Sequence, residues 1–202
     1  MNRRRFLLAS ALALPLRARA EPPLGAVREL SGAVFLNDYR VQRDTALQPG
    51  QTLSTGPDGH IWFTVGEDAF FLRPNSRLRL ETVRATSAVV DLLRLAAGAL
   101  GATFAHGPRR QLVTPTSTIG IRGTGVYVEA ADTWTYACTC FGNTHIEAMP
   151  KGKPGRAIDV SSKNHVARRI DLDGAILDMP FIRHTSDEIA RLENLVGRPN
   201  PF

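Results

Sequence analysis

HIWFTVGEDAFFLRPNSRLRLETV, residues 60–83, decides the fold class of this chain. Two turn signals, Gly66-Glu67-Asp68 and Pro74-Asn75, divide this stretch into short runs rich in aromatic and branched apolar residues. In the last run Leu78 and Leu80 alternate with arginines, which is the two-residue period of a half-buried strand. The stretch therefore predicts successive antiparallel strands.

Similar turn signals occur upstream, at Asn37-Asp38, Pro49-Gly50 and Gly56-Pro57-Asp58-Gly59. Turn signals about every ten residues are typical of an all-β sandwich or barrel-like fold, which we predict for residues 25–160. Residues 86–105, TSAVVDLLRLAAGALGATFA, fit either a helix or two strands around the glycines. Because both neighbouring segments are β, strands are favoured.

The C-terminal segment HTSDEIARLENLVGRPNPF, residues 184–202, predicts one α-helix. Thr185 or Ser186 supplies the N-cap, and Gly197 marks the end of the helix. Ile189 and Leu192 begin an apolar stripe. Residues 161–202 are therefore expected to form an extension whose helix packs on the β domain.

The first twenty residues, MNRRRFLLASALALPLRARA, have the pattern of a secretory signal peptide: a basic start, an apolar stretch and a small-x-small end. The apolar stretch is too short to span a bilayer, which takes about 20 residues. Consecutive arginines before Phe6 favour the twin-arginine (Tat) export route, with an ordinary Sec signal as the alternative. A soluble periplasmic protein is expected.

The charge of the chain is concentrated in this leader. The chain has 25 basic and 19 acidic residues, and residues 1–20 contain five arginines and no acid. The remaining near-neutral chain gives little electrostatic drive toward nucleic acid or an anionic membrane, so no nucleic-acid partner is expected. A second long apolar run and the common catalytic motifs are also missing from the sequence, so we expect a non-enzymatic protein whose mature chain has no transmembrane anchor.

Both cysteines lie in TYACTCFGNTHIEAM, residues 135–149. If Gly142-Asn143 form a two-residue hairpin turn, Cys140 lies opposite His145, and Cys138 lies on the same strand face as Cys140. Three interpretations remain open: a metal site, a disulfide, or reduced core cysteines. A disulfide would need a bend, because Cβ atoms two residues apart on a strand stand about 7 Å apart, whereas a disulfide needs about 3.8 Å.

VTPTSTIGIRGTGVYVEA, residues 113–130, and LQPGQTLSTGPDG, residues 47–59, resemble the FecR-type periplasmic domain, and the resemblance covers residues 25–148. It implies an all-β, exported, non-enzymatic binding or signalling module with an envelope protein or ligand as partner. In family members that regulate iron uptake, a sigma-factor-binding segment and a transmembrane helix precede this domain. Here the domain follows a cleavable signal directly, which predicts a free-standing module.

The resemblance also extends to a possible metal site. Some free-standing FecR-like chains are similar in a C-x-C-x-G segment, here Cys138 to Gly142, and in a later histidine before a Thr-x-Asp-Glu helix start. This implies a ligand set of Cys138, Cys140, His165 and His184, with His145 as a substitute for either histidine. Two thiolates and two imidazoles suit a single zinc ion, and copper or iron are also compatible with these ligand types. The alternatives are a periplasmic metal- or redox-handling protein, and an interaction domain stapled by a Cys138–Cys140 disulfide.

Overall fold

Strands dominate the computed structural model, which describes residues 25–48, 50–81, 91–107 and 109–202. The predicted leader at 1–20 lies outside the described residues. The strands are β1 (Gly25–Ser31), β2 (Val34–Leu36), β3 (Tyr39–Arg40), β4 (Ala46–Leu47), β5 (Thr52–Thr55), β6 (His60–Val65), β7 (Asp68–Leu72), β8 (Arg77–Glu81), β9 (Leu92–Thr103), β10 (Arg110–Val113), β11 (Ser117–Ala130), β12 (Trp134–Ala148), β13 (Ala157–Ser162), β14 (Val166–Asp171) and β15 (Ile176–Met179). The helix α1 spans Ser186–Leu195. The predicted all-β class with one C-terminal helix is confirmed.

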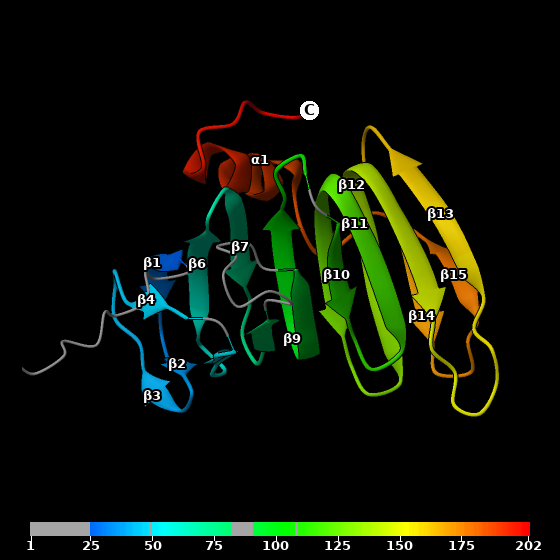
Figure 1. Cartoon of the computed structure of the whole chain (residues 1–202), viewed down its shortest axis with the longest axis horizontal. Helices are drawn as coiled ribbons and strands as arrows, with labels where there is room; N and C mark the ends of the chain where they lie inside the picture. The colour runs from blue at the N-terminus through cyan, green and yellow to red at the C-terminus, as the bar shows by residue number, and fades with distance from the viewer. Residues whose placement is uncertain (1–24, 49, 82–90, 108) are drawn as a thin grey trace, which may run out of the picture.

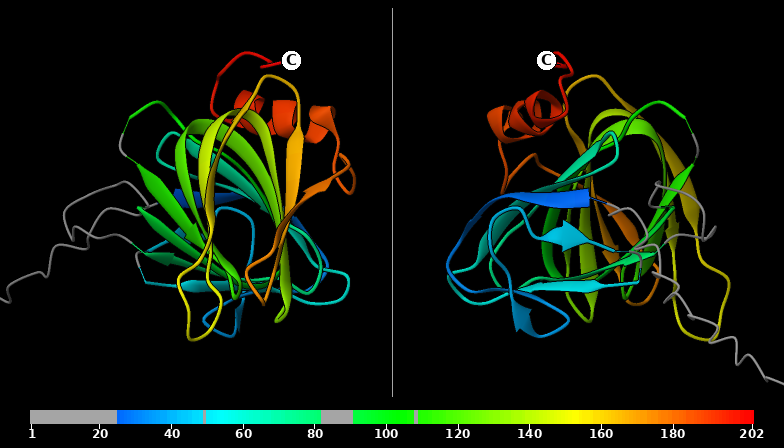
Figure 2. Two further views of the ribbon diagram at one scale, coloured as in Figure 1. Left: turned by 90° about the vertical axis from the view of Figure 1, so that its right-hand side faces the viewer. Right: turned by 60° about the vertical axis from the view of Figure 1, so that its left-hand side comes forward.

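All the strands belong to one hydrogen-bonded sheet, which curls into a barrel-like sandwich (Figures 1 and 2). Its three long strands, β9, β11 and β12, each change partners partway along their length. They therefore divide the sandwich into two layers. We call the layer under α1 the helix-covered layer; it holds β1, β6, β7, β14, β15 and the segments 98–103, 125–130 and 134–139 of the long strands. We call the other the open layer; it holds β2, β5, β8, β10, β13 and the segments 92–97, 117–122 and 142–147.

The predicted hairpin turn at Gly142-Asn143 is wrong. β12 runs through both residues, and it pairs with β11 along most of its length. At Gly142 the strand passes from β14 as its neighbour to β13, with a φ of +84° that favours glycine. A Cβ added at Gly142 would lie 2.3 Å from Thr124 Oγ1. A Gly-Asn pair between two strand-like runs usually marks a hairpin, but here the glycine forms a bulge at the corner between the layers.

The strand β8 follows the predicted alternating pattern. Leu78 and Leu80 in β8 are fully buried, whereas Arg77 and Arg79 are exposed. The ambiguous segment 86–105 is β rather than helical, as favoured, but it forms one strand, Leu92–Thr103, that continues through both glycines instead of two strands around them. Its residues 86–90 lie outside the described residues. One pairing, that of β10 with β9, is parallel, which the turn spacing did not predict.

The residues after 160 contribute strands as well as the helix. β14 pairs with the first half of β12, and β15 extends this edge of the sheet. Helix α1 starts at a capping box: the Glu188 backbone N–H donates to the Thr185 hydroxyl, and the Thr185 N–H donates to the Glu188 carboxylate. Ile189 and Leu192 are fully buried against the helix-covered layer. No helix among the described residues has the length and apolar content needed to cross a bilayer.

Candidate metal centre

Both cysteines lie on the outer face of the helix-covered layer. Side chains alternate along β12, so Tyr136, Cys138 and Cys140 point away from the main core and toward the helix side, where they pack in the cluster with Ile189 and Leu192. Cys138 and Cys140 are 1% and 0% exposed, and both are free thiols. The cysteines therefore share a strand face, as the sequence predicts, although the hairpin that would have placed His145 opposite Cys140 is absent.

Two histidines from later segments reach these thiols. His165 lies in the turn between β13 and β14, and His184 directly precedes the N-cap of α1. One ligand atom from each of Cys138, Cys140, His165 and His184 lies within 4.8 Å of all the others. The structure thus brings together the same four residues that the FecR resemblance implies as a ligand set.

The contact distances match a tetrahedral ion. Cys138 Sγ lies 3.7 Å from His165 Nδ1, and Cys140 Sγ lies 3.3 Å from His184 Nε2. With Zn–S about 2.3 Å and Zn–N about 2.0–2.1 Å, a sulfur and a nitrogen ligand of one tetrahedral zinc stand about 3.6 Å apart. In the same geometry two sulfur ligands stand about 3.8 Å apart and two nitrogen ligands about 3.3 Å apart, so a pair at the 4.8 Å limit needs to contract by about 1.0–1.5 Å.

His184 is held with its ligating nitrogen toward the thiols. Its Nδ1 lies 3.1 Å from the carbonyl oxygen of Ile182, which can only accept a hydrogen bond, so Nδ1 carries the proton and Nε2 offers its lone pair to the site. The ring also stacks on Tyr127, with centroids 4.3 Å apart and planes 15° apart. Metal-binding histidines are usually oriented in this way by a partner on the other nitrogen.

His165 is fixed by both its backbone and its ring. Its N–H donates to the carbonyl of Cys140 at 2.9 Å, and its φ of +49° turns the chain back over β12. The Nε2 atom lies 2.9 Å from the hydroxyl of Ser186, which leaves Nδ1 facing Cys138. Phe181 stacks on the ring with centroids 3.8 Å apart, so an aromatic side chain covers the more exposed side of the site.

The electrostatics of the site favour one thiolate in the absence of an ion. The hydrogen bond from Cys140 lowers the pKa of Cys138 to about 5, and His184 and His165 act in the same direction against the effect of burial. Burial raises the pKa of Cys140, and it lowers the pKa of His165. A cation between the sulfurs would allow both to ionise, since two buried like charges oppose each other.

A second layer of contacts fixes the segment that carries His184. Arg73 donates to Glu188 at 2.7 Å and to the Tyr127 hydroxyl at 3.3 Å, and that hydroxyl donates to Glu129 at 2.6 Å. Arg183 forms an ion pair with Glu129 at 3.4 Å. The start of α1 is therefore docked on the sheet by ion pairs as well as by its capping box.

Sequence reasoning missed these supporting residues. The sequence marks Ser186 only as a possible helix N-cap. Tyr127 lies in a different strand, and no sequence pattern links it to the histidines. His145, the predicted substitute ligand, lies on the open layer, where its Nδ1 is 2.8 Å from Asp159. It does not belong to the four-residue group.

Comparison with known proteins supports the architecture. No family model matches the chain, and no curated protein matches it. Two crystal structures of a "putative anti-sigma factor" from Parabacteroides distasonis ATCC 8503 share the fold with a TM-score of 0.51 and 15% sequence identity. The match covers 63% of this chain and 58% of that protein, so the chain spans less than two thirds of its length. At this identity the likeness is one of fold alone.

Proposed function

We propose that the chain is a non-enzymatic FecR-type module of the bacterial envelope that holds one zinc ion between Cys138, Cys140, His165 and His184. The convergence of these four ligand atoms within 4.8 Å carries the proposal. The ion joins the strand β12 to the C-terminal segment, so its binding free energy adds to the stability of the folded domain. The partner-binding surface of the module would then depend on a fold that the ion helps to maintain.

Zinc suits this ligand set best among the three metals. Two thiolates and two imidazoles form a complete tetrahedral shell, and structural zinc sites take this form. Cysteine ligands also suit Cu(I) and iron, so elemental analysis of the protein should measure copper and iron as well as zinc. Mg²⁺ and Ca²⁺ do not suit the site, because they require oxygen ligands.

A structural role for the ion fits the enclosure of the site better than catalysis does. Catalytic zinc sites keep one position open for water or substrate, with three protein ligands. Here the protein offers four ligands, and Cys138, Cys140 and His184 are each at most 6% exposed. An ion in this position would have no free coordination position for a substrate.

Two observations support an envelope location and a binding or signalling role. The leader-like sequence at 1–20 has the features of an export signal, and the twin-arginine route would carry a protein that is already folded and metal-loaded. The fold is shared with a protein described as an anti-sigma factor, which is a regulatory binding protein by that description. Signalling in this chain would therefore take place through protein binding.

The experiment is elemental analysis of the protein purified without chelator from its own export route, paired with thiol titration under denaturing conditions. We expect one zinc per chain and two titratable thiols after unfolding. Cys138→Ser and His165→Ala should lose the ion, whereas His145→Ala, an exposed histidine outside the group, should keep it. A metal-free protein with two free thiols, or one with no free thiol, contradicts the proposal; the second result supports the disulfide alternative.

A further inference from the structure

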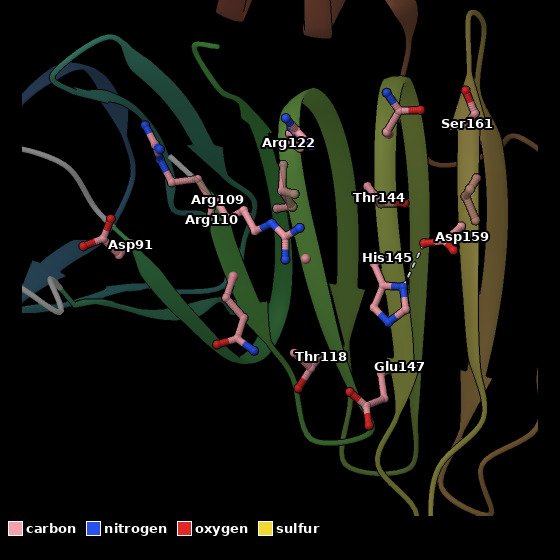
Figure 3. A pocket seen from close by; sticks show the side chains of 15 residues that line it. Asp91, Arg109, Arg110, Thr118, Arg122, Thr144, His145, Glu147, Asp159 and Ser161 are labelled. Carbon is pink, nitrogen blue, oxygen red and sulfur yellow. Dashed lines mark hydrogen bonds and ion pairs between the residues drawn. The ribbon is translucent and has the colours of Figure 1, made fainter. Parts of the chain in front are cut away.

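The outer face of the open layer contains a pocket that the metal centre does not explain. It has a volume of about 850 Å³ and lies over β10, β11, β12 and β13 (Figure 3). Pockets of roughly 300–1,000 Å³ are the usual size for small-molecule sites. The pocket lies on the opposite layer from α1, so a ligand bound there would not compete with the metal ion.

The strand register arranges the pocket side chains in rows across the sheet. The pairing of β10 with β11 begins at Arg110, opposite Ile121; Arg109, which directly precedes β10, and Arg122, the next residue of β11, both line this end of the pocket. Arg122 is paired in turn with Asn143 on β12, and Asn143 with Ser161 on β13. This first row therefore presents two guanidinium groups, an amide and a hydroxyl, all of which can donate hydrogen bonds.

Gly120 occupies the middle of the next row and forms the floor. Its register partners are Gln111 on β10 and His145 on β12. A glycine in a strand interior weakens the strand, and it often marks the close approach of a ligand or another backbone. At Gly120 the backbone φ is not positive, and an added Cβ would meet nothing closer than His145 Cβ at 3.6 Å, an ordinary contact.

This distinguishes Gly120 from the glycines that the fold requires. At Gly125 an added Cβ would lie 2.3 Å from the Phe141 ring, and Gly142 meets a similar obstacle. Neither backbone conformation nor packing demands a glycine at 120. What the missing side chain does provide is an open floor between the arginine row and His145.

The charges of the first row are also unbalanced. Within the part of the chain that the structure describes, neither Arg109 nor Arg122 forms an ion pair, and both are exposed. Like charges that lie close together across neighbouring strands are destabilising. An anion between the two guanidinium groups would remove that repulsion through charge-assisted hydrogen bonds.

Acidic groups border the pocket on its other sides and limit where an anion can lie. Asp159 is paired with His145, and Glu147 stands beside Thr118 in the row beyond Gly120. Asp91 also lines the pocket, near the start of β9. The negative group of a ligand must therefore lie at the Arg109–Arg122 row, with neutral polar groups over Gly120 and toward Thr118.

We propose that this face binds a small hydroxylated anion, whose carboxylate or phosphate is held by Arg109 and Arg122 and whose hydroxyl-bearing body lies over Gly120. Both anionic groups match the planar fork of arginine. The hydroxyls would meet Asn143, Ser161 and Thr118. This ligand site is independent of the proposed metal site, so either can fail without the other.

Calorimetric titration of the full chain as purified, with glucuronate, glucose 6-phosphate and glucose as probes, tests the proposal. We expect at least one of the two anions to bind and neutral glucose not to bind; which anion binds distinguishes carboxylate from phosphate. Arg122→Gln should weaken binding at least about tenfold, which corresponds to the loss of a charged hydrogen bond. The control Arg77→Gln removes another exposed arginine, on β8, that forms no ion pair with any described residue, and it should leave binding unchanged.

Gly120→Val tests the open space over Gly120 separately from the charge of the two arginines. We expect its side chain to occupy the floor and abolish binding while the melting temperature stays at or above that of the unchanged protein, and Gly120→Ala should show a smaller loss of affinity. The proposal is overturned if neither anion binds, if Arg77→Gln weakens binding as much as Arg122→Gln does, or if Gly120→Val binds as tightly as the unchanged protein.

Discussion

Replacing His184 by alanine should make the thermal stability of the protein independent of metal. The free energy that an ion adds depends on its concentration relative to its dissociation constant, and free ion at about 100 times that constant adds about 2.7 kcal/mol. For a domain of this size each kcal/mol corresponds to roughly 2–4 °C in melting temperature. Chelation of the unchanged protein should therefore lower its melting temperature by about 5–10 °C.

The variant has a second effect that must be separated from the first. The His184 ring stacks on Tyr127 and is only 6% exposed, so its removal also leaves a small cavity. Comparing the unchanged and variant proteins with and without chelator isolates the contribution of the ion to the free energy of unfolding. The loss of ring packing in the variant is the same in both conditions and therefore cancels. We expect the full response to chelator in the unchanged protein and none in His184→Ala.

The assay is thermal unfolding by circular dichroism, with and without a zinc chelator, together with limited proteolysis of the C-terminal segment. His145→Ala is the matched control, since it removes an exposed histidine outside the four-residue group and should retain the full chelator response. Cleavage near α1 should become faster on chelation, although the Arg73–Glu188 ion pair limits complete release. A His184→Ala protein that still loses several degrees on chelation would refute this reasoning.

Three further predictions concern other parts of the chain. Replacing Arg4 and Arg5 by lysine should retain the protein in the cytoplasm, measured by cell fractionation; normal export of this variant would instead indicate the Sec route. Gly142→Ala should destabilise the domain by roughly 1–3 kcal/mol in a denaturant titration, because its φ is +84° and the new Cβ would meet Thr124 Oγ1, and an unchanged midpoint would argue against the corner geometry. Asp68→Asn should cost about 3–5 kcal/mol in the same titration, since Asp68 and Arg110 form an ion pair at 3.0 Å with exposures of 2% and 5%; a loss below about 1 kcal/mol would contradict this.

The strands that alternate in polarity could be predicted from sequence, and those that bend could not. β8 has one buried and one exposed face throughout, so its two-residue period is visible in the residues themselves. In β12 the residues that face the main core change from odd-numbered, as at Ala137, to even-numbered, as at Ile146, when the strand changes layer at Gly142, and local sequence presents that change as a hairpin turn. A corner is decided by partners far away in the chain, here β13 and β14, which local patterns do not encode.

The candidate metal site also has a part that sequence could predict, the two cysteines, and a part that it could not. Cys138 and Cys140 fall on one face of a strand whichever way the chain turns after Cys140, because residues two apart share a face. The choice of His165 and His184 depended on the family resemblance, since nothing in the spacing of residues 140–184 fixes where those side chains lie. Ser186, Tyr127 and Phe181, which orient or cover the two rings, become visible only in three dimensions.

The open-layer pocket could not have been predicted from composition. Arg109 and Arg122 are distant in sequence from Asn143 and Ser161, and each alone is an ordinary exposed side chain. Only the strand register places Arg122, Asn143 and Ser161 in one row, with Arg109 at the end of β10 lining the same pocket. The sequence shows Gly120 as one of several glycines inside a predicted strand. That a side chain would fit at Gly120 but not at Gly142 depends on the atoms around each Cβ position, which only the structure shows.

X-ray absorption spectroscopy at the metal edge, on protein purified from its own export route, tests the central claim most directly. The account predicts a single zinc environment with two sulfur ligands at about 2.3 Å and two nitrogen ligands at about 2.0–2.1 Å. Cys140→Ser should remove one sulfur from that shell or abolish binding. A shell made only of oxygen and nitrogen, or a protein that reaches the periplasm without any metal, would contradict the claim that these four residues form a metal centre.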